Sequence, residues 1–260
     1  NVGKVWDAMV DIVVEQCEQD GLEPMSINPV VGECNDSRIN QIQKRVVGAD
    51  EVRQAFASAS EEFEEGDVGA GAGTICYGLK GGIGSASRVI RIGEKEYTIG
   101  VLVQSNFGAT EDFVLNGESV GAKILDWKQE KDDMAASEED KGSIMSILAT
   151  DLPLTSRQLR RILRRTGVGI ARTGGYTGHG SGEVMIGFTT ANRIPSGAEE
   201  ELLQIQAIPE HVINRAFLAA AEAEQEAILN SMTAAERTRG QAGELYYSLS
   251  EYLEDQDSKQ

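Results

Sequence analysis

The chain has 260 residues, 40% of them hydrophobic, which is enough for one substantial core or two small ones. Its formal charge of −18 argues against a general affinity for nucleic acid, because phosphate binding needs clustered Lys and Arg side chains. The longest apolar runs, such as residues 99–103, are far shorter than the roughly 20 residues of a membrane helix. We therefore expect a globular α/β protein with no membrane span and no nucleic-acid partner.

The cysteines and histidines narrow the possible chemistry. Cys17, Cys34 and Cys76 are odd in number and widely spaced, which argues against a disulfide framework and a zinc site. Such cysteines suit a reducing compartment, so a cytoplasmic location is expected. His179 and His211 leave little material for a His-based metal site or a Ser-His-Asp system.

The first half of the chain reads as helices followed by strands. Residues 1–16 have the amphipathic pattern of a helix and lack the basic start and apolar centre of a secretory leader. A second helical pattern lies around Val52, Phe56 and Phe63. Strand and turn signals come next: strands at residues 74–79, 85–92 and 97–104, and a hairpin turn at Asn116-Gly117.

A junction between a polar loop and an apolar strand is the most informative stretch. Residues 128–142 are too polar to bury, whereas residues 143–150 have the apolar run of a strand buried on both faces. If the Gly142-Ser143 bond were cut, Ser143 would carry both a hydroxyl and an α-amine, which titrates near ~7.7. The junction alone fits an ordinary strand start or a self-cleavage site.

Beyond the junction the pattern returns to helices around one strand. Thr155 and Gln158 have capping-box spacing, and the glycine-rich loop 174–182 leads to a strand at 184–189. A long helix is expected from Pro209 to Met232, and a last helix carries Leu245, Tyr246, Leu249, Tyr252 and Leu253. Because helices and strands are grouped, sheet layers covered by helices are favoured over a Rossmann fold.

Ser181 and Glu183 form a second candidate group. They are two residues apart at the start of a strand, so their side chains point the same way and can form a hydroxyl-carboxylate relay. The alternative is a Ser-Gly turn with a solvated glutamate. The loop is not a nucleophile elbow, because His179 occupies the first glycine position of that motif.

Six blocks of sequence carry a more specific signal. They are PVVGECND (29–36), GAGTICYGLKGGIGSASR (71–88), IGVLVQSNFG (99–108), KGSIMSILATDLPL (141–154), ARTGGYTGHGSGEVMIGFTTANR (171–193) and AEQEAILNSM (223–232). In this order they resemble the DmpA-type L-aminopeptidase/D-esterase and β-peptidyl aminopeptidase family. The resemblance runs from about residue 2 to about residue 232.

The resemblance implies an N-terminal-nucleophile hydrolase, built as a four-layer αββα sandwich, with the N-terminal part of the family pattern missing. It implies one catalytic domain, residues 1–260, that cleaves itself between Gly142 and Ser143 into pieces 1–142 and 143–260. Ser143 then becomes the nucleophile.

The resemblance also implies roles for four further residues. Ser181 and Glu183 support the nucleophile, Asn106 donates to the oxyanion, and Glu33 receives the free amine of the substrate. These roles are chemically sensible, since an amide can stabilise developing negative charge and a carboxylate complements an ammonium group.

We therefore expect a self-processing serine aminopeptidase that acts on the N-terminal residue of short peptides, amides or esters, with β- or D-residues as possible substrates. The resemblance implies no metal or organic cofactor, and it implies a homo-oligomer, with a tetramer favoured. Two alternatives stay open: an ornithine acetyltransferase-like acyl transferase, whose nucleophile is threonine, and an uncleaved binding or structural relative.

Overall fold

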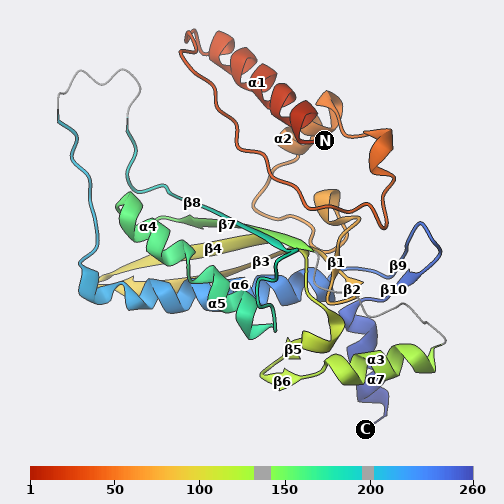
Figure 1. Cartoon of the computed structure of the whole chain (residues 1–260). Coiled ribbons are helices and arrows are strands. Elements are labelled where there is room, and N and C mark those ends of the chain that lie inside the picture. Colours follow the sequence, from red (N-terminus) through yellow and green to blue (C-terminus); the bar gives the residue numbers. More distant parts are fainter. Residues whose placement is uncertain (132–141, 195–201, 260) are drawn as a thin grey trace.

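The computed structural model describes residues 1–131, 142–194 and 202–259. Its main feature is a four-stranded sheet with the strand order β3-β4-β7-β8 (Figure 1). The strands are β3 (Gly82–Ile92), β4 (Lys95–Asn106), β7 (Ser143–Thr150) and β8 (Gly182–Thr189). β4 is antiparallel to both β3 and β7, whereas β8 is parallel to β7. The expected strands of this sheet are therefore confirmed.

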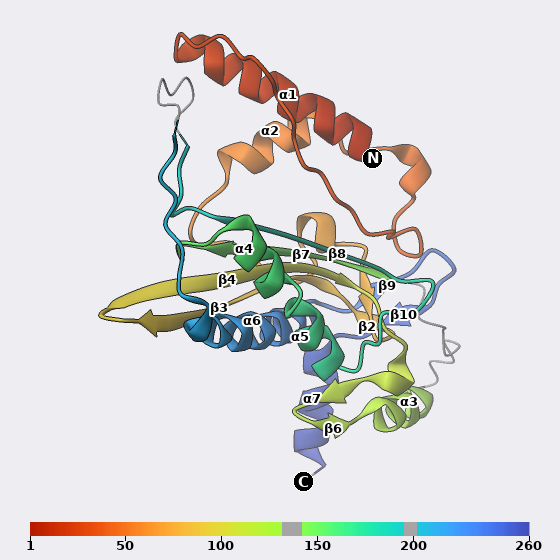
Figure 2. The ribbon, with the colours of Figure 1, turned by 60° about the vertical axis from the view of Figure 1, so that its left-hand side comes forward.

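Three helices cover one face of the sheet. α6 (Asn214–Thr233) lies along β3 and β4, α5 (Thr166–Arg172) packs beside α6, and α4 (Ser156–Leu163) lies against β8 (Figure 2). The side chain of Thr155 accepts a hydrogen bond from the Gln158 backbone N–H, as the capping-box spacing predicted. None of the described helices is long and apolar enough to span a lipid bilayer.

The other elements are short or lie outside these layers. α1 and α2 pack on each other on the side of the sheet opposite α6, as both views of the ribbon show (Figures 1 and 2). The helices are α1 (Val2–Gln19), α2 (Ala49–Ala57), α3 (Gly121–Glu130), α7 (Leu249–Ser258), η1 (Ile42–Lys44), η2 (Gly69–Gly71), η3 (Thr110–Asp112) and η4 (Glu210–Val212). The remaining strands form two-stranded sheets: β1 (Ile75–Cys76) pairs with β2 (Leu79–Lys80), β5 (Val114–Leu115) with β6 (Glu118–Ser119), and β9 (Thr238–Arg239) with β10 (Leu245–Tyr246).

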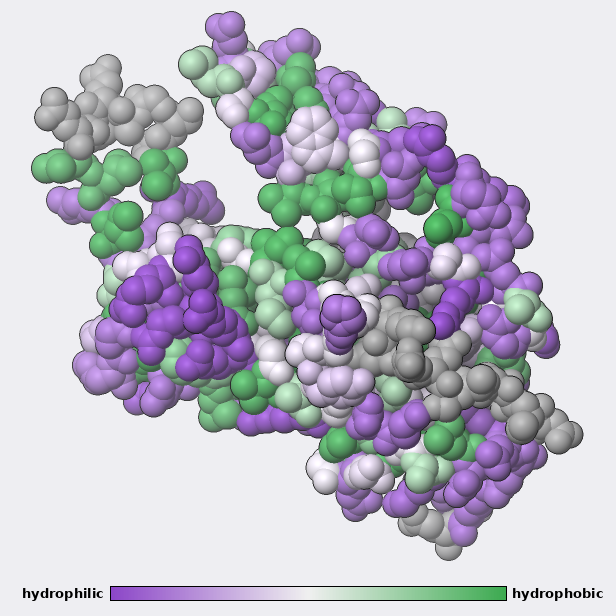
Figure 3. Space-filling view, viewed as in Figure 1, coloured by the Kyte–Doolittle hydropathy of each residue, from purple (hydrophilic) through white to green (hydrophobic). Residues whose placement is uncertain are grey.

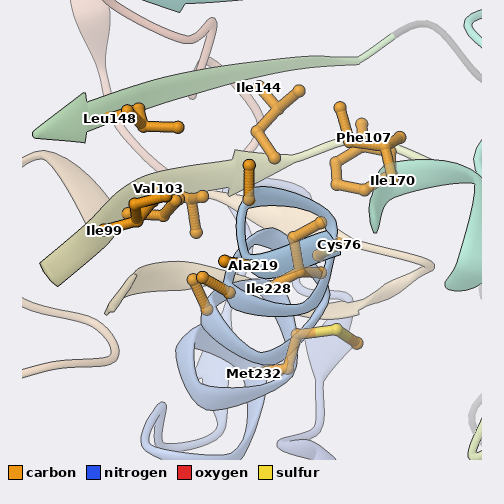
Figure 4. Close-up of a cluster of buried hydrophobic side chains, with 14 of the residues drawn as sticks. Cys76, Ile99, Val103, Phe107, Ile144, Leu148, Ile170, Ala219, Ile228 and Met232 are labelled. Carbon is orange, nitrogen blue, oxygen red and sulfur yellow. The ribbon is translucent and has the colours of Figure 1, made fainter. Parts of the chain in front are cut away.

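The hydrophobic core lies between the sheet and α6. Alternate residues of β4 and β7 point toward α6, among them the buried Val103, Ile144 and Leu148 (Figure 4). The contact is close enough that a Cβ atom on Gly84 would overlap the carbonyl oxygen of Ala227. Glycine on the strand and alanines on the helix therefore let the two backbones approach.

A buried carboxyl group lies within this core. The hydroxyl of Ser146 on β7 donates to Oε1 of Glu224 on α6 at 2.5 Å, and both residues are fully buried. Oε2 of Glu224 has no hydrogen-bond partner in the described part of the chain. Burial raises the pKa of Glu224 to about 7, against the lowering effect of the Ser146 hydrogen bond.

The opposite face of the sheet is apolar but open. Ile147, Val184 and Phe188 are 38%, 47% and 49% exposed there. Apolar side chains are visible on the surface between the α1–α2 pair and the sheet (Figure 3). The described residues thus contribute one sheet and one layer of helices to the expected sandwich.

Several local predictions were wrong. β7 is buried on one face only, because Ile147 on its other face is 38% exposed. Lys128 was expected to be too polar to bury but is buried in α3, and residues 132–141 of the expected loop lie outside the described residues.

Residues 74–79 are not one strand, because Tyr77 and Gly78 have φ angles of 51° and 69° and form the turn between β1 and β2. α2 ends at Ala57, so Phe63 lies outside it. The last helix begins at Leu249, since Leu245 and Tyr246 form β10 instead.

Candidate active site

Three strand ends meet at the predicted junction. Ser143, the first residue of β7, is the register partner of Asn106, the last residue of β4, and of Gly182, the first residue of β8. Antiparallel partners have Cα atoms about 4.5–5.5 Å apart, which puts the Asn106 side chain close to Ser143. The structure therefore brings together strands that are far apart in the sequence.

The peptide bond before Ser143 is held from two sides. The carbonyl oxygen of Gly142 accepts a hydrogen bond from the backbone N–H of Gly182 at 3.1 Å. On the other side, a Cβ atom on Gly142 would overlap the carbonyl oxygen of Asn106 and lie 2.5 Å from the Cα atom of Phe107. Glycine at this position therefore permits a close backbone contact with the end of β4.

Asn106 is nearly buried, and its side-chain amide has a fixed orientation. Its Oδ1 accepts a hydrogen bond from the backbone N–H of Ile75 at 3.0 Å, and its Nδ2 donates to the carbonyl oxygen of Asn35 at 3.2 Å. An amide nitrogen carries two protons, so one N–H of Asn106 is left for a further acceptor.

Ser181 and Glu183 form the predicted pair, with the Ser181 hydroxyl donating to Oε1 of Glu183 at 2.6 Å. In the β7–β8 register Glu183 lies beside Ile144, whose side chain is buried on the α6 face. Strand alternation places Ser143 and Asn106 on the opposite face. Within the described residues, no hydrogen bond joins the Ser143 side chain to Ser181, Glu183 or Asn106.

Glu33 lies on a segment that crosses the open face of the sheet. The Gly32 position contacts the side chain of Met145, and the thiol of Cys34 donates to the carbonyl oxygen of Ser143 at 3.5 Å. Burial raises the pKa of Cys34, whereas hydrogen bonds from the Ser143 side chain and the Met145 backbone lower it. Glu33 itself is exposed, one residue from this contact.

A cavity of about 650 Å³ opens beside the junction, and Gly142 and Asn106 are part of its wall. Charged side chains from distant segments also line it, namely Asp36, Arg38, Lys128 and Glu244. Sequence reasoning missed these four residues. Asp36 could have been found, because it ends the PVVGECND block that carries the family resemblance. The segment around Glu244 belongs to none of the six blocks.

Within residues 1–131, 142–194 and 202–259, no group of three or more His, Cys, Asp or Glu side chains is positioned to hold a metal ion. The polar groups described around Ser143 are hydroxyls, a thiol, an amide, carboxylates and backbone N–H groups.

Comparison with known proteins gives consistent matches. Residues 1–246 match the family described as Peptidase family S58. The chain is 36% identical over 248 residues to the β-peptidyl aminopeptidase BapA of Sphingosinicella xenopeptidilytica, covering 92% of this chain and 61% of the relative. It is 35% identical over 224 residues to BapA of Sphingosinicella microcystinivorans, covering 83% and 57%. The chain thus spans about three fifths of the length of these relatives.

Solved structures show the same fold. The PH0078 protein of Pyrococcus horikoshii has a TM-score of 0.86 and 44% identity, covering 97% of this chain and 69% of that one. The l-aminopeptidase d-ala-esterase/amidase of Ochrobactrum anthropi, described as a variant of the Ntn hydrolase fold, has a TM-score of 0.85 and 32% identity, covering 98% and 69%. The expected α/β fold of N-terminal-nucleophile hydrolase type is confirmed by these matches.

Proposed function

The chain belongs to peptidase family S58, and from this premise we propose that it is a self-processing serine aminopeptidase. The observation that carries the proposal is the position of Ser143, at the head of β7 between Asn106 and Gly182. If cleavage freed the α-amine of Ser143, the residue would combine a hydroxyl with a base that titrates near neutral pH. Cleavage between Gly142 and Ser143 of a single catalytic domain, residues 1–260, would produce that serine.

The other roles combine the family resemblance with the position of each side chain. The spare N–H of Asn106 donates to the oxyanion formed when Ser143 attacks a substrate carbonyl. The family resemblance gives the Ser181–Glu183 pair, at the start of the strand beside Ser143, a supporting role in proton transfer, although the register places Glu183 on the face opposite Ser143. Glu33, on the segment above Ser143, pairs with the substrate ammonium and so favours action at the N-terminus.

The relatives support a class of substrate. Their names include a β-peptidyl aminopeptidase and an l-aminopeptidase d-ala-esterase/amidase. We assign to this chain short peptides, amides and esters with a free N-terminal amine, including those with β- or D-residues. The reaction uses no metal or organic cofactor.

A homotetramer in the cytoplasm is part of the same proposal. The three free cysteines, two of them buried, are consistent with a reducing compartment. Light scattering of the purified protein at several concentrations would measure the number of subunits.

Mass spectrometry under denaturing conditions tests the proposal directly. Freshly purified protein should give two pieces, residues 1–142 and 143–260, and N-terminal sequencing of the second should begin at Ser143. The same sample should release the N-terminal residue from a β-peptide and from an L-alanyl amide. An active protein that stays one chain would contradict self-cleavage, and an intact inactive protein would favour a binding or structural role.

A further inference from the structure

The hydrogen bond at the junction involves a backbone group rather than a side chain, the N–H of Gly182. We propose that the backbone N–H of Gly182 stabilises the negative charge on the Gly142 carbonyl oxygen during self-cleavage. In the intact chain the donor nitrogen already lies 3.1 Å from this oxygen, and oxyanion donors typically lie about 2.7–3.1 Å from the charged oxygen. The inference rests on the proposed self-cleavage and concerns only that first reaction.

The surroundings limit movement of the scissile peptide. The end of β4 contacts it so closely that no Cβ atom fits on Gly142 without a shift. The next carbonyl oxygen, that of Ser143, accepts a hydrogen bond from Cys34 at 3.5 Å. A carbonyl group held between two strands stays aligned with its donor as its oxygen gains charge, which is the condition for electrostatic stabilisation without reorganisation.

The reaction has defined bond changes. The hydroxyl oxygen of Ser143 attacks the carbonyl carbon of Gly142, and the resulting tetrahedral intermediate places its negative charge on the oxygen that faces Gly182. The C–N bond then breaks, the Ser143 nitrogen takes up the hydroxyl proton, and an ester between Gly142 and the Ser143 oxygen remains. Water hydrolyses this ester and leaves a Gly142 carboxylate and a Ser143 with a free amine and hydroxyl.

Asn106 does not duplicate this role in the intact chain. Its Nδ2 donates to the carbonyl oxygen of Asn35 and its Oδ1 accepts from Ile75, and among the described residues its remaining N–H makes no hydrogen bond to Gly142. Self-cleavage and substrate hydrolysis therefore use different first donors: Gly182 for the bond inside the chain, and Asn106 for the bond in the substrate.

Replacing one amide by an ester tests the assignment with little change of shape. Glycolic acid in place of Gly182 removes the N–H and keeps the carbonyl group. As the matched control, the α-hydroxy analogue of valine replaces Val184. Val184 lies two residues after Gly182 on β8 and is the register partner of Met145, so its N–H faces β7 as that of Gly182 does. Both variants lose one donor of the same strand, so their thermal unfolding should change equally.

Self-cleavage of the three chains is followed by gel and mass spectrometry after synthesis. The Gly182 ester should slow the appearance of the two pieces about 100-fold relative to the parent, whereas the Val184 ester should stay within about threefold. If the parent chain cleaves and the two ester variants cleave at equal rates, the assignment to Gly182 is overturned. A parent chain that never cleaves would instead refute the proposed self-processing.

Discussion

The two faces of the four-stranded sheet differ in what their residues do. On the α6 face, β4 and β7 contribute Val103, Ile144 and Leu148 to a core with almost no exposed surface. On the opposite face the same strands carry Asn106 and Ser143 at one end and partly exposed apolar side chains along their length. The α6 face stabilises the sheet, and the open face carries Ser143 and Asn106, which we propose take part in the reaction.

This difference follows from alternation along each strand. A shift of one residue in register would exchange the two sets of side chains. The packing of small residues against α6 fixes the register, and the register in turn fixes where Ser143 lies. Substitutions in the buried core of the α6 face should therefore lower stability, whereas substitutions of Ser143 or Asn106 should lower activity.

The largest effect is expected for the two serines of β7. Ser143→Ala should abolish both self-cleavage and turnover, because the only group proposed to attack is removed. Ser146→Ala, three residues further on the α6 face, should cleave and turn over normally per folded molecule. It should lose about 1–3 kcal/mol of unfolding free energy, because the Glu224 carboxyl would then have no hydrogen-bond partner among the described residues.

Denaturant unfolding and an aminopeptidase assay on the same samples would separate these outcomes. Labelling of Ser181 rather than Ser143 by a serine-directed covalent inhibitor would show that the roles are assigned wrongly.

Two glycines test the packing of the faces without touching the proposed chemistry. Gly84→Ala should destabilise the protein by about 3 kcal/mol or more, because its Cβ atom would overlap the α6 backbone at Ala227. Gly100→Ala, on the open face, has only the Ala149 carbonyl oxygen nearby, at 3.9 Å. It should be neutral or stabilise the strand by about 0.5–1 kcal/mol. Similar unfolding midpoints for the two variants would contradict the close helix–sheet contact.

The pH dependence of stability should report the buried carboxyl. Burial raises the pKa of Glu224 to about 7 in the folded protein from 4.5. Between these pH values the folded chain keeps a proton that the unfolded chain loses, so stability falls as pH rises. The fall is complete above about pH 7 and amounts to at most about 3 kcal/mol.

Glu224→Gln should remove this pH dependence and keep the shape of the side chain. As pH rises from 4.5 to 8, the free energy of unfolding of the variant should increase relative to that of the parent, measured by urea unfolding at each pH. Parallel stability curves for parent and variant would mean that Glu224 does not hold its proton in the fold.

The sequence predicted the sheet well because its signals are local. β3, β4, β7 and β8 have alternating or continuous apolar patterns between turn residues, and Thr155 and Gln158 mark a helix start that the structure confirms. The turn inside residues 74–79 was missed because Tyr77, a residue that rarely has positive φ, adopts a φ of 51° next to Gly78.

Features that depend on distant packing were not predictable. Glu222, Glu224 and Glu226 look alike in the sequence, yet Glu222 and Glu226 pair with Arg88 while Glu224 points into the core. Only the rotation of α6 against the sheet decides which glutamate is buried. The cavity beside Gly142 likewise combines segments that no local pattern connects, including Asp36 and Glu244. The separation of Glu183 and Ser143 onto opposite faces required the β7–β8 register.

The smallest effect is expected at Glu33, on the segment that crosses the open face. Its carboxylate is exposed, and an ion pair in contact with water contributes about 1 kcal/mol or little more. Glu33→Gln should therefore lower kcat/KM for substrates with a free amine about tenfold, a change that corresponds to 1.4 kcal/mol.

N-acetylated substrates provide the decisive comparison, because acetylation removes the charge that Glu33 is proposed to bind. The parent should hydrolyse them far more slowly than free-amine substrates. Glu33→Gln should lower the ratio of kcat/KM for free-amine substrates to kcat/KM for acetylated substrates by the same factor of about ten. Glu94→Gln is the matched control, since Glu94 is exposed in the β3–β4 turn at the end of the sheet away from Asn106. It should leave the ratio unchanged. Equal kcat/KM for free and acetylated substrates in the parent would exclude an ammonium site at Glu33, and a smaller ratio in the Glu94 variant would show that the overall negative charge of −18 attracts the substrate instead.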